Sequence, residues 1–412
     1  MKRSILLSAL LLIAVFIVIG CKSEIAEVKA PYERRLLPGE PALRKMTSSY
    51  EVPDFTMACF DLTDLRKAIT NSQDYLRKPS SQEFFPCRYT SSDQTDSGEI
   101  SHSQALSSLN AFAALLDSGL TGKQLNEAVR AKFDAYMSVG CDGIGTVLFT
   151  GYYTPIFDGS LSQKGHYNYP LYRTPDDLVK DATGEILGRR SRSGNIRPYP
   201  PRSMLEDLDM LEGMELVWLR DPFEAYIAHV QGSAKIRLPD GKTIAVGYDA
   251  SNGHEYQSVA KELVRDGRIS PEQVSLSEMI AFFRRNKDLV DVYVRRNPRF
   301  VFFKKEMGEP RGSLNEPVIP YRSIATDKSI FPRGCLTFIT TYLPKVKDTM
   351  GSLGTTSTIA NQLYSGFALD QDTGGAIRAA GRCDVYMGQG EMAGELAGQT
   401  YQEGRLYYLF LK

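Results

Sequence analysis

Apolar residues recur at helical spacing between residues 104 and 137. They form two series separated by Gly119: Leu106, Leu109, Phe112 and Leu116, then Leu125, Val129 and Phe133. This pattern predicts two helices. A continuous apolar run at residues 146–153 predicts a buried strand, which ends in the stretch Gly151-Tyr152-Tyr153-Thr154-Pro155. A long polar, Pro-rich stretch follows, and we expect it to be irregular.

Polar and apolar residues then alternate over residues 234–238 and 243–246, around an Asp240-Gly241 turn. This predicts a β-hairpin. Apolar spacing predicts a helix that Gly267 ends, and Ser270-Pro271 predicts the start of another. Short strands are predicted after these helices, at residues 299–303, 318–324, 336–341, 375–377, 385–386 and 406–410. The second half is therefore expected to be rich in β-structure, with helices mostly before it.

The first 21 residues have the organisation of an export signal. Lys2 and Arg3 precede an apolar run over residues 5–19, and Gly20-Cys21 ends it. A small residue before a lone cysteine is typical of a bacterial lipoprotein signal. We expect residues 1–20 to be the signal peptide, Cys21 to carry the lipid, and residues 21–52 to be a tether. An ordinary secretory signal and a single helix anchor are the alternatives, although the run is short for a span of ~20 residues.

Composition excludes several classes of function. Basic and acidic residues balance at 49 each, which argues against a nucleic-acid partner. The histidines are four and widely separated, and the cysteines have no CxxC spacing, so we expect no metal and no cofactor. Five cysteines follow Cys21, an odd number that leaves at least one thiol free, and the sequence fixes no pairing among Cys59, Cys87, Cys141, Cys335 and Cys383.

The densest candidate for chemistry is residues 371–390, where Asp372 and Asp384 flank a glycine-rich loop. Glycines allow close approach of a ligand to the backbone, and a carboxyl group can exchange a proton with a glycosidic oxygen. Asp and Gly are also ordinary turn residues, so a purely structural role stays open. No Gly-Lys-Ser/Thr ending follows, which excludes a phosphate-binding loop.

This patch resembles the C-terminal block of the membrane-bound lytic transglycosylase A (MltA) family. The family pattern Asp-x-Gly-Gly-Ala-Ile-(Lys/Arg)-Gly corresponds to residues 372–379, and its following Asp block to residues 383–386. Further blocks match in order, at residues 151–155, 169–175, 229–236, 297–303, 312–314 and 322–325. Ordered matches over about two-thirds of the chain make the resemblance specific.

The resemblance implies a mainly β fold with N-terminal helices. We expect a double-ψ β-barrel from residues 53–152 and 306–412, an inserted β domain at 153–305, and a groove between them. It also implies that Asp384 is catalytic, with Asp372 as the neighbouring acidic residue. Tyr153, Thr154, Gln231, Gly374 and Gly375 are candidate substrate contacts. The alternatives are core packing for Tyr152 and Tyr153 and a buried structural role for Gln231. If residues 382–386 are extended, Arg382 shares a face with Asp384 and would stabilise the ionised acid, whereas Asp372 would favour the proton; the sequence leaves this balance open.

The implied activity is that of a lyase, a peptidoglycan lytic exotransglycosylase. It would cut the β-1,4 bond between N-acetylmuramic acid and N-acetylglucosamine and form a 1,6-anhydro ring, with one Asp acting as acid and then as base. A hydrolytic glycosidase on the same barrel and a non-enzymatic peptidoglycan-binding lipoprotein are the alternatives. The expected partners are glycan strands, the membrane through Cys21, and cell-wall enzyme complexes. The expected location is the outer membrane, facing the periplasm.

Overall fold

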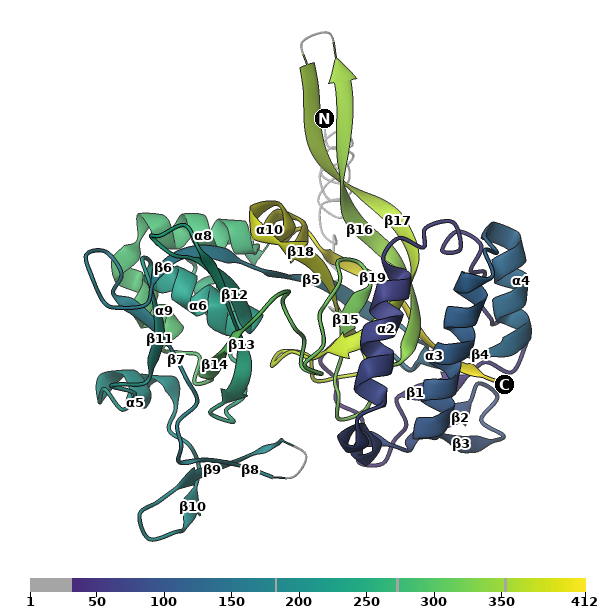
Figure 1. Ribbon diagram of the computed structural model, residues 1–412, viewed down its shortest axis with the longest axis horizontal. Helices are drawn as coiled ribbons and strands as arrows, with labels where there is room; N and C mark the ends of the chain where they lie inside the picture. The colour runs from purple at the N-terminus through teal and green to yellow at the C-terminus, as the bar shows by residue number, and fades with distance from the viewer. Residues whose placement is uncertain (1–31, 182–183, 272–273, 352–353) are drawn as a thin grey trace, which may run out of the picture. The chain divides into compact units, whose positions relative to one another are not determined.

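Six β-strands close on themselves to form a barrel. The computed structural model describes residues 32–412 except 182–183, 272–273 and 352–353 (Figure 1). Around the barrel the order is β16 (Leu336–Gly351), β17 (Gly354–Asp372), β15 (Ser323–Ala325), β18 (Arg382–Gln389), β5 (Val147–Thr154) and β19 (Tyr401–Leu411). The pairing of β19 with β16 closes the ring. This closed barrel confirms the predicted fold class.

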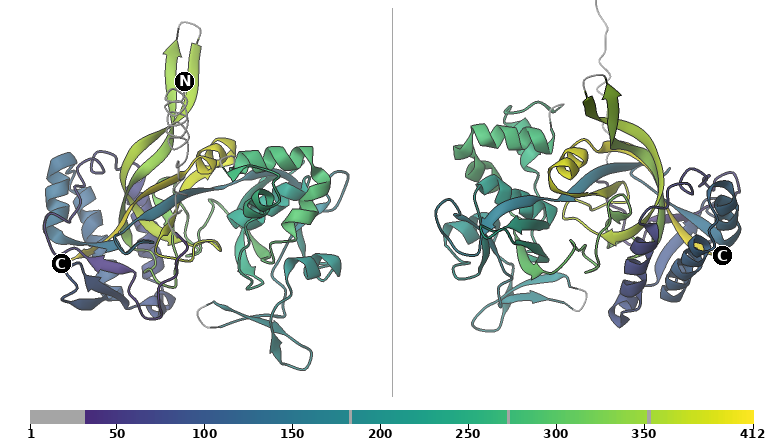
Figure 2. Two further views of the ribbon diagram at one scale, coloured as in Figure 1. Left: turned by 180° about the vertical axis from the view of Figure 1, so that it is seen from behind. Right: turned by 45° about the horizontal axis from the view of Figure 1, so that its top comes forward.

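The barrel sheet continues outward through four more strands, which are β4 (Phe133–Ser138), β1 (Leu43–Lys45), β2 (Cys87–Ser91) and β3 (Ser97–Ile100). Helices α2 (Leu65–Leu76), α3 (His102–Asp117) and α4 (Gly122–Lys132) lie beside it (Figures 1 and 2). Buried aromatic rings from helix and sheet meet in the core, as where Phe112 contacts Phe367 at 4.9 Å between ring centroids. Burial of these rings is the main force holding helix and sheet together.

Two expectations for this region need correction. The predicted helix was extended to residue 137, but Phe133 begins β4, because pairing with β19 and β1 takes precedence over the helical spacing. Residues 43–45 lie inside the segment predicted as a tether, yet they form β1, and Leu43 is fully buried.

The inserted segment builds a second sheet of six strands. Their order is β14 (Val301–Glu306), β13 (Thr243–Ser251), β12 (Ser233–Arg237), β6 (Ile156–Ser160), β11 (Glu215–Leu219) and β7 (Tyr169–Tyr172). The hairpin of β12 and β13 is confirmed, with Ala234 opposite Val246. The Pro-rich stretch expected to be irregular instead contains strands of this sheet and a small sheet of β8 (Leu178–Lys180), β9 (Ile186–Arg190) and β10 (Ile196–Arg197).

Helices cover the insert sheet (Figure 1). They are α5 (Arg202–Asp207), α6 (Pro222–Gln231), α7 (Val259–Arg265), α8 (Leu276–Arg285) and α9 (Val290–Val294). Gly267 follows α7 with φ +67°, as a helix stop requires. The start of α8 differs from the prediction, because the hydroxyl of Ser275 accepts the Glu278 amide and caps the helix there.

Strand β17 and helix α10 (Gly390–Gly398) are among the elements that were not predicted. Strand β17, of 19 residues, pairs with β16, of 16 residues, and the hairpin that they form extends far from the barrel (Figures 1 and 2). Helix α10 follows β18 directly. Residues 375–377, which were predicted as a strand, form a turn, because Ile377 donates its amide to the Gly374 carbonyl at 3.1 Å.

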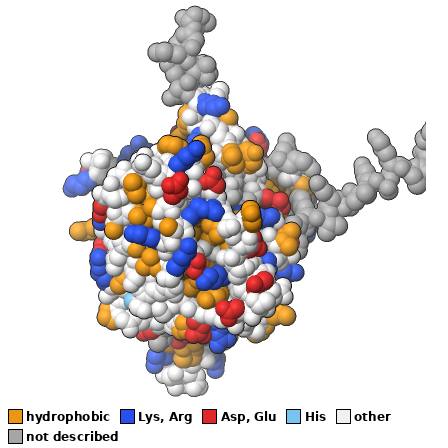
Figure 3. All heavy atoms as spheres, turned by 90° about the vertical axis from the view of Figure 1, so that its right-hand side faces the viewer, with side chains coloured by type: hydrophobic (Ala, Val, Ile, Leu, Met, Phe, Trp, Pro, Cys, Tyr) orange, Lys and Arg blue, Asp and Glu red, His pale blue; other side chains and the backbone are white. Residues whose placement is uncertain are grey.

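Across the described residues, no helix combines the length and apolar character needed to cross a membrane. The face over α3 and α4 intersperses basic, acidic and hydrophobic side chains (Figure 3). The side chains on this face therefore form no patch of a single charge, of the kind that nucleic-acid binding uses.

Candidate active site in the cavity between barrel and insert

A cavity of about 600 Å³ is lined by residues of both the barrel and the insert. Strand β5 connects the two, because it pairs with β18 and β19 in the barrel and its end, Thr154, leads through Pro155 into β6. The cavity wall includes Asp372, Asp384, Thr154, Gln231, Gly374 and Gly375. Six of the seven predicted catalytic and substrate-binding residues therefore meet in one place.

Asp384 lies on β18, directly opposite Thr150 of the parallel strand β5. The Thr150 hydroxyl donates a hydrogen bond to Asp384 Oδ1. Arg382 Nη2 lies 3.2 Å from the Thr150 hydroxyl oxygen and 3.5 Å from the same Oδ1, so the two side chains share a face, as expected. Asp384 Oδ2 has no hydrogen-bond partner among the described residues and is not a buried unsatisfied atom. The protein thus fixes one oxygen of Asp384 and leaves the other open.

Asp372 is held differently, at the end of β17. Its Oδ1 accepts the backbone amides of Ser313 at 2.7 Å and Thr373 at 2.8 Å. Burial raises the pKa of Asp372, and this effect outweighs the two amide hydrogen bonds, which lower it. These contacts tie the loop after β17 to the segment around Ser313.

Glycine is required at position 375 of this loop because a larger side chain would not fit, and not because the backbone adopts a positive φ. Neither Gly374 nor Gly375 has a positive φ. A Cβ on Gly375 would lie 2.8 Å from Nε of Arg299. The loop backbone therefore packs directly on an arginine side chain of the insert.

Strand alternation separates the tyrosines of β5. Tyr153 turns away from the cavity: its ring packs against Gly394 of α10 and is 6% exposed. Tyr152 lines the cavity in its place, and its ring centroid is 5.1 Å from that of Tyr386. The buried Tyr152 hydroxyl lies near Asp372, and burial together with that carboxyl group raises the pKa of Tyr152. The sequence showed both tyrosines but not which one faced the site.

Thr154 and Gln231, the two polar side chains expected to contact the substrate, already form hydrogen bonds within the protein. Thr154 is buried, with its hydroxyl 2.9 Å from that of Tyr386. Gln231 Oε1 accepts the Tyr153 amide at 3.2 Å, which leaves the side-chain amide nitrogen of Gln231 without a partner in the described structure. Tyr386 was missed by the sequence analysis, although its place two residues after Asp384 puts it on the same face.

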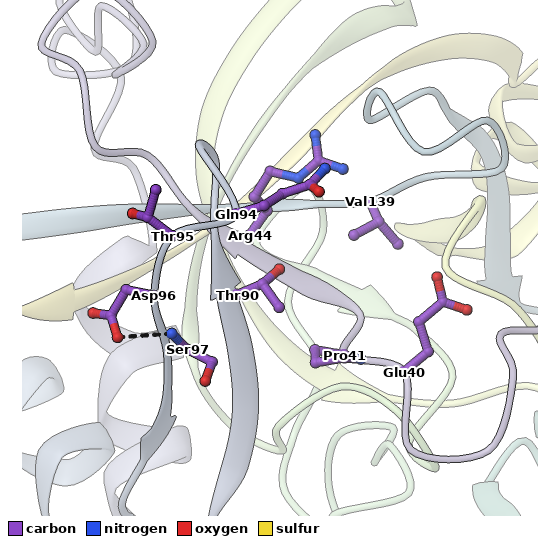
Figure 4. A pocket seen from close by; sticks show the side chains of 9 residues that line it. All are labelled: Glu40, Pro41, Arg44, Thr90, Gln94, Thr95, Asp96, Ser97 and Val139. Carbon is purple, nitrogen blue, oxygen red and sulfur yellow. Dashed lines mark hydrogen bonds between the residues drawn. The ribbon is translucent and has the colours of Figure 1, made fainter.

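The remaining predicted site residue, Cys21, lies outside the described residues. All five later cysteines are free thiols. A second hollow of about 500 Å³ lies beside β1 and β2, where the side chains of Arg44, Thr90 and Asp96 surround it (Figure 4). It contains none of the predicted site residues, whereas six of them line the cavity between barrel and insert.

Comparison with family models finds two matches. Residues 148–304 match the MltA specific insert domain, and residues 322–410 match the 3D domain. The first match covers most of β5 and the insert sheet as far as residue 304 in β14, and the second contains Asp372 and Asp384. Both blocks of the cavity wall are thus recognised independently.

Comparison with known proteins gives the same result. The membrane-bound lytic murein transglycosylase A of Escherichia coli K12 is 30% identical over 279 residues, which cover 67% of this chain and 69% of that protein. A membrane-bound lytic murein transglycosylase from Agrobacterium tumefaciens superposes with a TM-score of 0.70 at 23% identity, covering 90% of this chain and 98% of the other. The E. coli MltA structure with bound chitohexaose gives 0.62 at 24%, covering 88% and 97%.

Proposed function

This chain belongs to the membrane-bound lytic murein transglycosylase A family, and from that premise we propose that Asp384 alone carries its chemistry. The family acts on peptidoglycan, so the chain is a lytic transglycosylase of the cell envelope. The proposed cleavage is at the β-1,4 bond between N-acetylmuramic acid and N-acetylglucosamine. The observation that carries the proposal is the open Oδ2 of Asp384 on the cavity wall.

The arrangement around Asp384 suits a general acid. Thr150 and Arg382 both contact Oδ1, so Oδ2 is the oxygen that is free to exchange a proton with the substrate. Oδ2 protonates the glycosidic oxygen as the bond to the anomeric carbon breaks. The resulting carboxylate then takes the proton from the C6 hydroxyl of the same muramic acid residue. That hydroxyl oxygen bonds to the anomeric carbon and closes the 1,6-anhydro ring.

A second carboxylate for activating water is not required by this reaction. A hydrolase that inverts or retains configuration uses two carboxyl groups. Here the other aspartate of the wall, Asp372, has Oδ1 occupied by two backbone amides. Its proposed role is to hold the Gly374-Gly375 loop and to contribute a nearby carboxyl group. The attack by a hydroxyl already in the substrate gains the advantage of an intramolecular reaction.

The groove residues are assigned on the same basis. Thr154, Gln231 and the backbone of Gly374 and Gly375 are proposed to contact the glycan, because all of them line the cavity. A stacking contact with a sugar face is proposed for Tyr152, which lines the cavity, whereas Tyr153 is buried away from it. We also keep the division at residues 152/153 and 305/306 as the proposed boundary between barrel and insert.

Attachment to the outer membrane through a lipid on Cys21 remains a proposal from the sequence of residues 1–21. Two or three acyl chains would anchor the protein stably. The test is incorporation of labelled palmitate into the protein in cells, which Cys21→Ala should abolish. Incorporation that survives this change would refute the assignment of Cys21.

The decisive experiment for the activity is mass analysis of purified murein sacculi after digestion. The protein should release muropeptides that end in 1,6-anhydro-N-acetylmuramic acid, whereas reducing ends would indicate the hydrolytic alternative. Asp384→Asn should lower the release by ~100-fold or more, the usual contribution of a general acid, while binding to sacculi persists. Undiminished release would refute the assignment of Asp384.

Asp372→Asn is the matched control, because it makes the same change of atoms on the same wall. Asn keeps an oxygen that can accept the Ser313 and Thr373 amides, so the loop is retained. We expect this variant to lose less activity than Asp384→Asn. An equal or greater loss would mean that the proton is carried by the pair rather than by Asp384.

A further inference from the structure

We propose that Arg299 and Arg378 form an anion subsite in the cavity, which binds a carboxylate carried on the lactyl branch of N-acetylmuramic acid. The inference rests on the proposed function for the identity of the polymer. It goes further by assigning the part of the substrate that distinguishes peptidoglycan from an uncharged chitin-like oligosaccharide. Both arginines line the same cavity as Asp384.

Arg299 is fixed in place by the insert. Its Nη1 donates to the backbone carbonyl of His254 at 3.1 Å, and its own carbonyl accepts Nη2 of Arg202 at 3.0 Å. The backbone of Gly375 packs against its Nε. Burial lowers the pKa of the Arg299 guanidinium, the mark of a cation whose loss of water is incompletely offset. No carboxylate of the described residues lies within ion-pair distance of it.

Arg378 approaches from the barrel side, on the loop that Asp372 anchors. Its side chain is exposed at the cavity, and it makes no hydrogen bond or ion pair with any described residue. It lies close enough to Arg299 for the two like charges to interact, which further lowers the Arg299 pKa. One guanidinium group from the insert and one from the barrel therefore line the same cavity, and neither forms an ion pair with a carboxylate of the described residues.

The acidic side chains nearby do not occupy this position. Glu185 lines the cavity and interacts with Arg299 electrostatically, but it forms no ion pair. Glu255 is within the electrostatic range of Arg378, yet it is bound to Arg35 at 2.6 Å. That hydrogen bond is also the main cause of the lowered pKa of Glu255. The positive charge of the pair is thus available to a ligand.

The ligand chemistry follows from the guanidinium group. Its planar set of donors matches the two oxygens of a carboxylate, and two such groups can share one anion. A glycan strand without peptides carries a free lactyl carboxylate on each muramic acid. In a strand with peptides that carboxyl is an amide, and the carboxylates are those of the peptide. A chitin-like oligosaccharide has neither.

The test measures affinity in the full chain that carries Asp384→Asn, so that no ligand is consumed. The probes are chitohexaose, a glycan strand stripped of peptides, and a strand that retains them. We expect a carboxylate-bearing strand to bind at least ~10-fold more tightly than chitohexaose, the scale of one charge-assisted hydrogen bond. Adding Arg378→Gln should abolish that preference and change chitohexaose affinity by less than ~2-fold.

Arg311→Gln serves as the matched control. Arg311 lines the same cavity, but it donates to the Asn315 carbonyl at 2.6 Å and lies 3.9 Å from Glu316. We expect this variant to retain the preference, and Arg378→Lys to retain part of it. An equal loss in Arg311→Gln would attribute the effect to overall charge and overturn the subsite.

The outcomes separate the two proposals and the two carboxylate sources. Preference for the stripped strand assigns the lactyl carboxylate, and preference for the intact strand assigns the peptide. No preference in the parent protein, or a preference that Arg378→Gln leaves intact, refutes the subsite. Release of anhydro-muropeptides by the chain with Asp384 intact is measured separately, so its absence refutes the proposed function instead.

Discussion

Lys328→Met tests how the barrel supports the loop of Asp372. The Lys328 side chain is only 5% exposed, and its ammonium group contacts Asp370, a residue with no exposed surface two positions before Asp372. Asp370 Oδ2 also accepts the hydroxyls of Thr326 at 2.7 Å and Tyr408 at 2.6 Å. Removing the lysine charge leaves a buried carboxylate with two neutral donors and no cation.

The magnitude follows from this burial. Breaking a buried ion pair by removing one partner costs about 3–5 kcal/mol, because the remaining charge stays out of water. Burial lowers the pKa of Lys328, which shows that the pair already bears a desolvation cost. The double variant Lys328→Met with Asp370→Asn removes both charges and retains an oxygen for Tyr408. The double variant should therefore be at least ~2 kcal/mol more stable than the sum of the two single-variant losses in unfolding free energy would give.

The assay is urea unfolding of the purified protein and its variants, followed by far-ultraviolet circular dichroism. Lys261→Met is the matched control, since Lys261 pairs with Glu33 at 3.0 Å on the surface. That variant should lose less than ~1 kcal/mol. If the two buried substitutions prove additive, or if Lys328→Met costs no more than Lys261→Met, the reasoning about the buried pair is wrong.

Three further changes probe the site and its surroundings. Thr150→Val removes the donor to Asp384 and should slow release of anhydro-muropeptides by about 10-fold, with activity restored in Thr150→Ser; wild-type rates in the valine variant would contradict this role. Gly151→Ala places a Cβ 2.6 Å from the Cα of Ala397, and overpacking there should lower unfolding free energy by about 1–3 kcal/mol; an unchanged melting temperature would show that α10 can move. Burial raises the pKa of Glu224 to about 7, so the stability it contributes is full below its unfolded pKa and is lost as pH rises through 7. Because Glu224 is partly exposed, solvent screening reduces the effect, and Glu224→Gln should raise the free energy of unfolding by roughly 1–2 kcal/mol at pH 8 and leave it unchanged at pH 4. An increase that is independent of pH would exclude this explanation.

Local patterns in the sequence determined several elements correctly. The apolar run at residues 146–153 became β5, and the alternation around Asp240-Gly241 became the hairpin of β12 and β13. Both depend on short-range side-chain periodicity, which burial on one or both faces imposes directly. The ordered motifs also predicted Asp384 and Asp372 as neighbours in one site, and both line the same cavity.

Tertiary pairing decided what those patterns left open. The apolar spacing that ends at Phe133 predicted a helix as far as residue 137, but hydrogen bonds from β19 and β1 on both sides make residues 133–138 a strand. The choice of Tyr152 over Tyr153 followed from the register that sets Tyr152 opposite Tyr386. A shift of one residue would have exchanged their faces, because side chains alternate along a strand.

Arg299 and Arg378 show most clearly which features depend on sequence and which depend on tertiary structure. Each stands in a motif of the sequence, but they come from the insert and from the barrel. Sequence by itself determined which residue types are present and which short segments fold as strand or helix, since those depend on neighbours in the chain. The closing of the barrel brought the distant segments together, because contacts between residues far apart depend on how every layer packs.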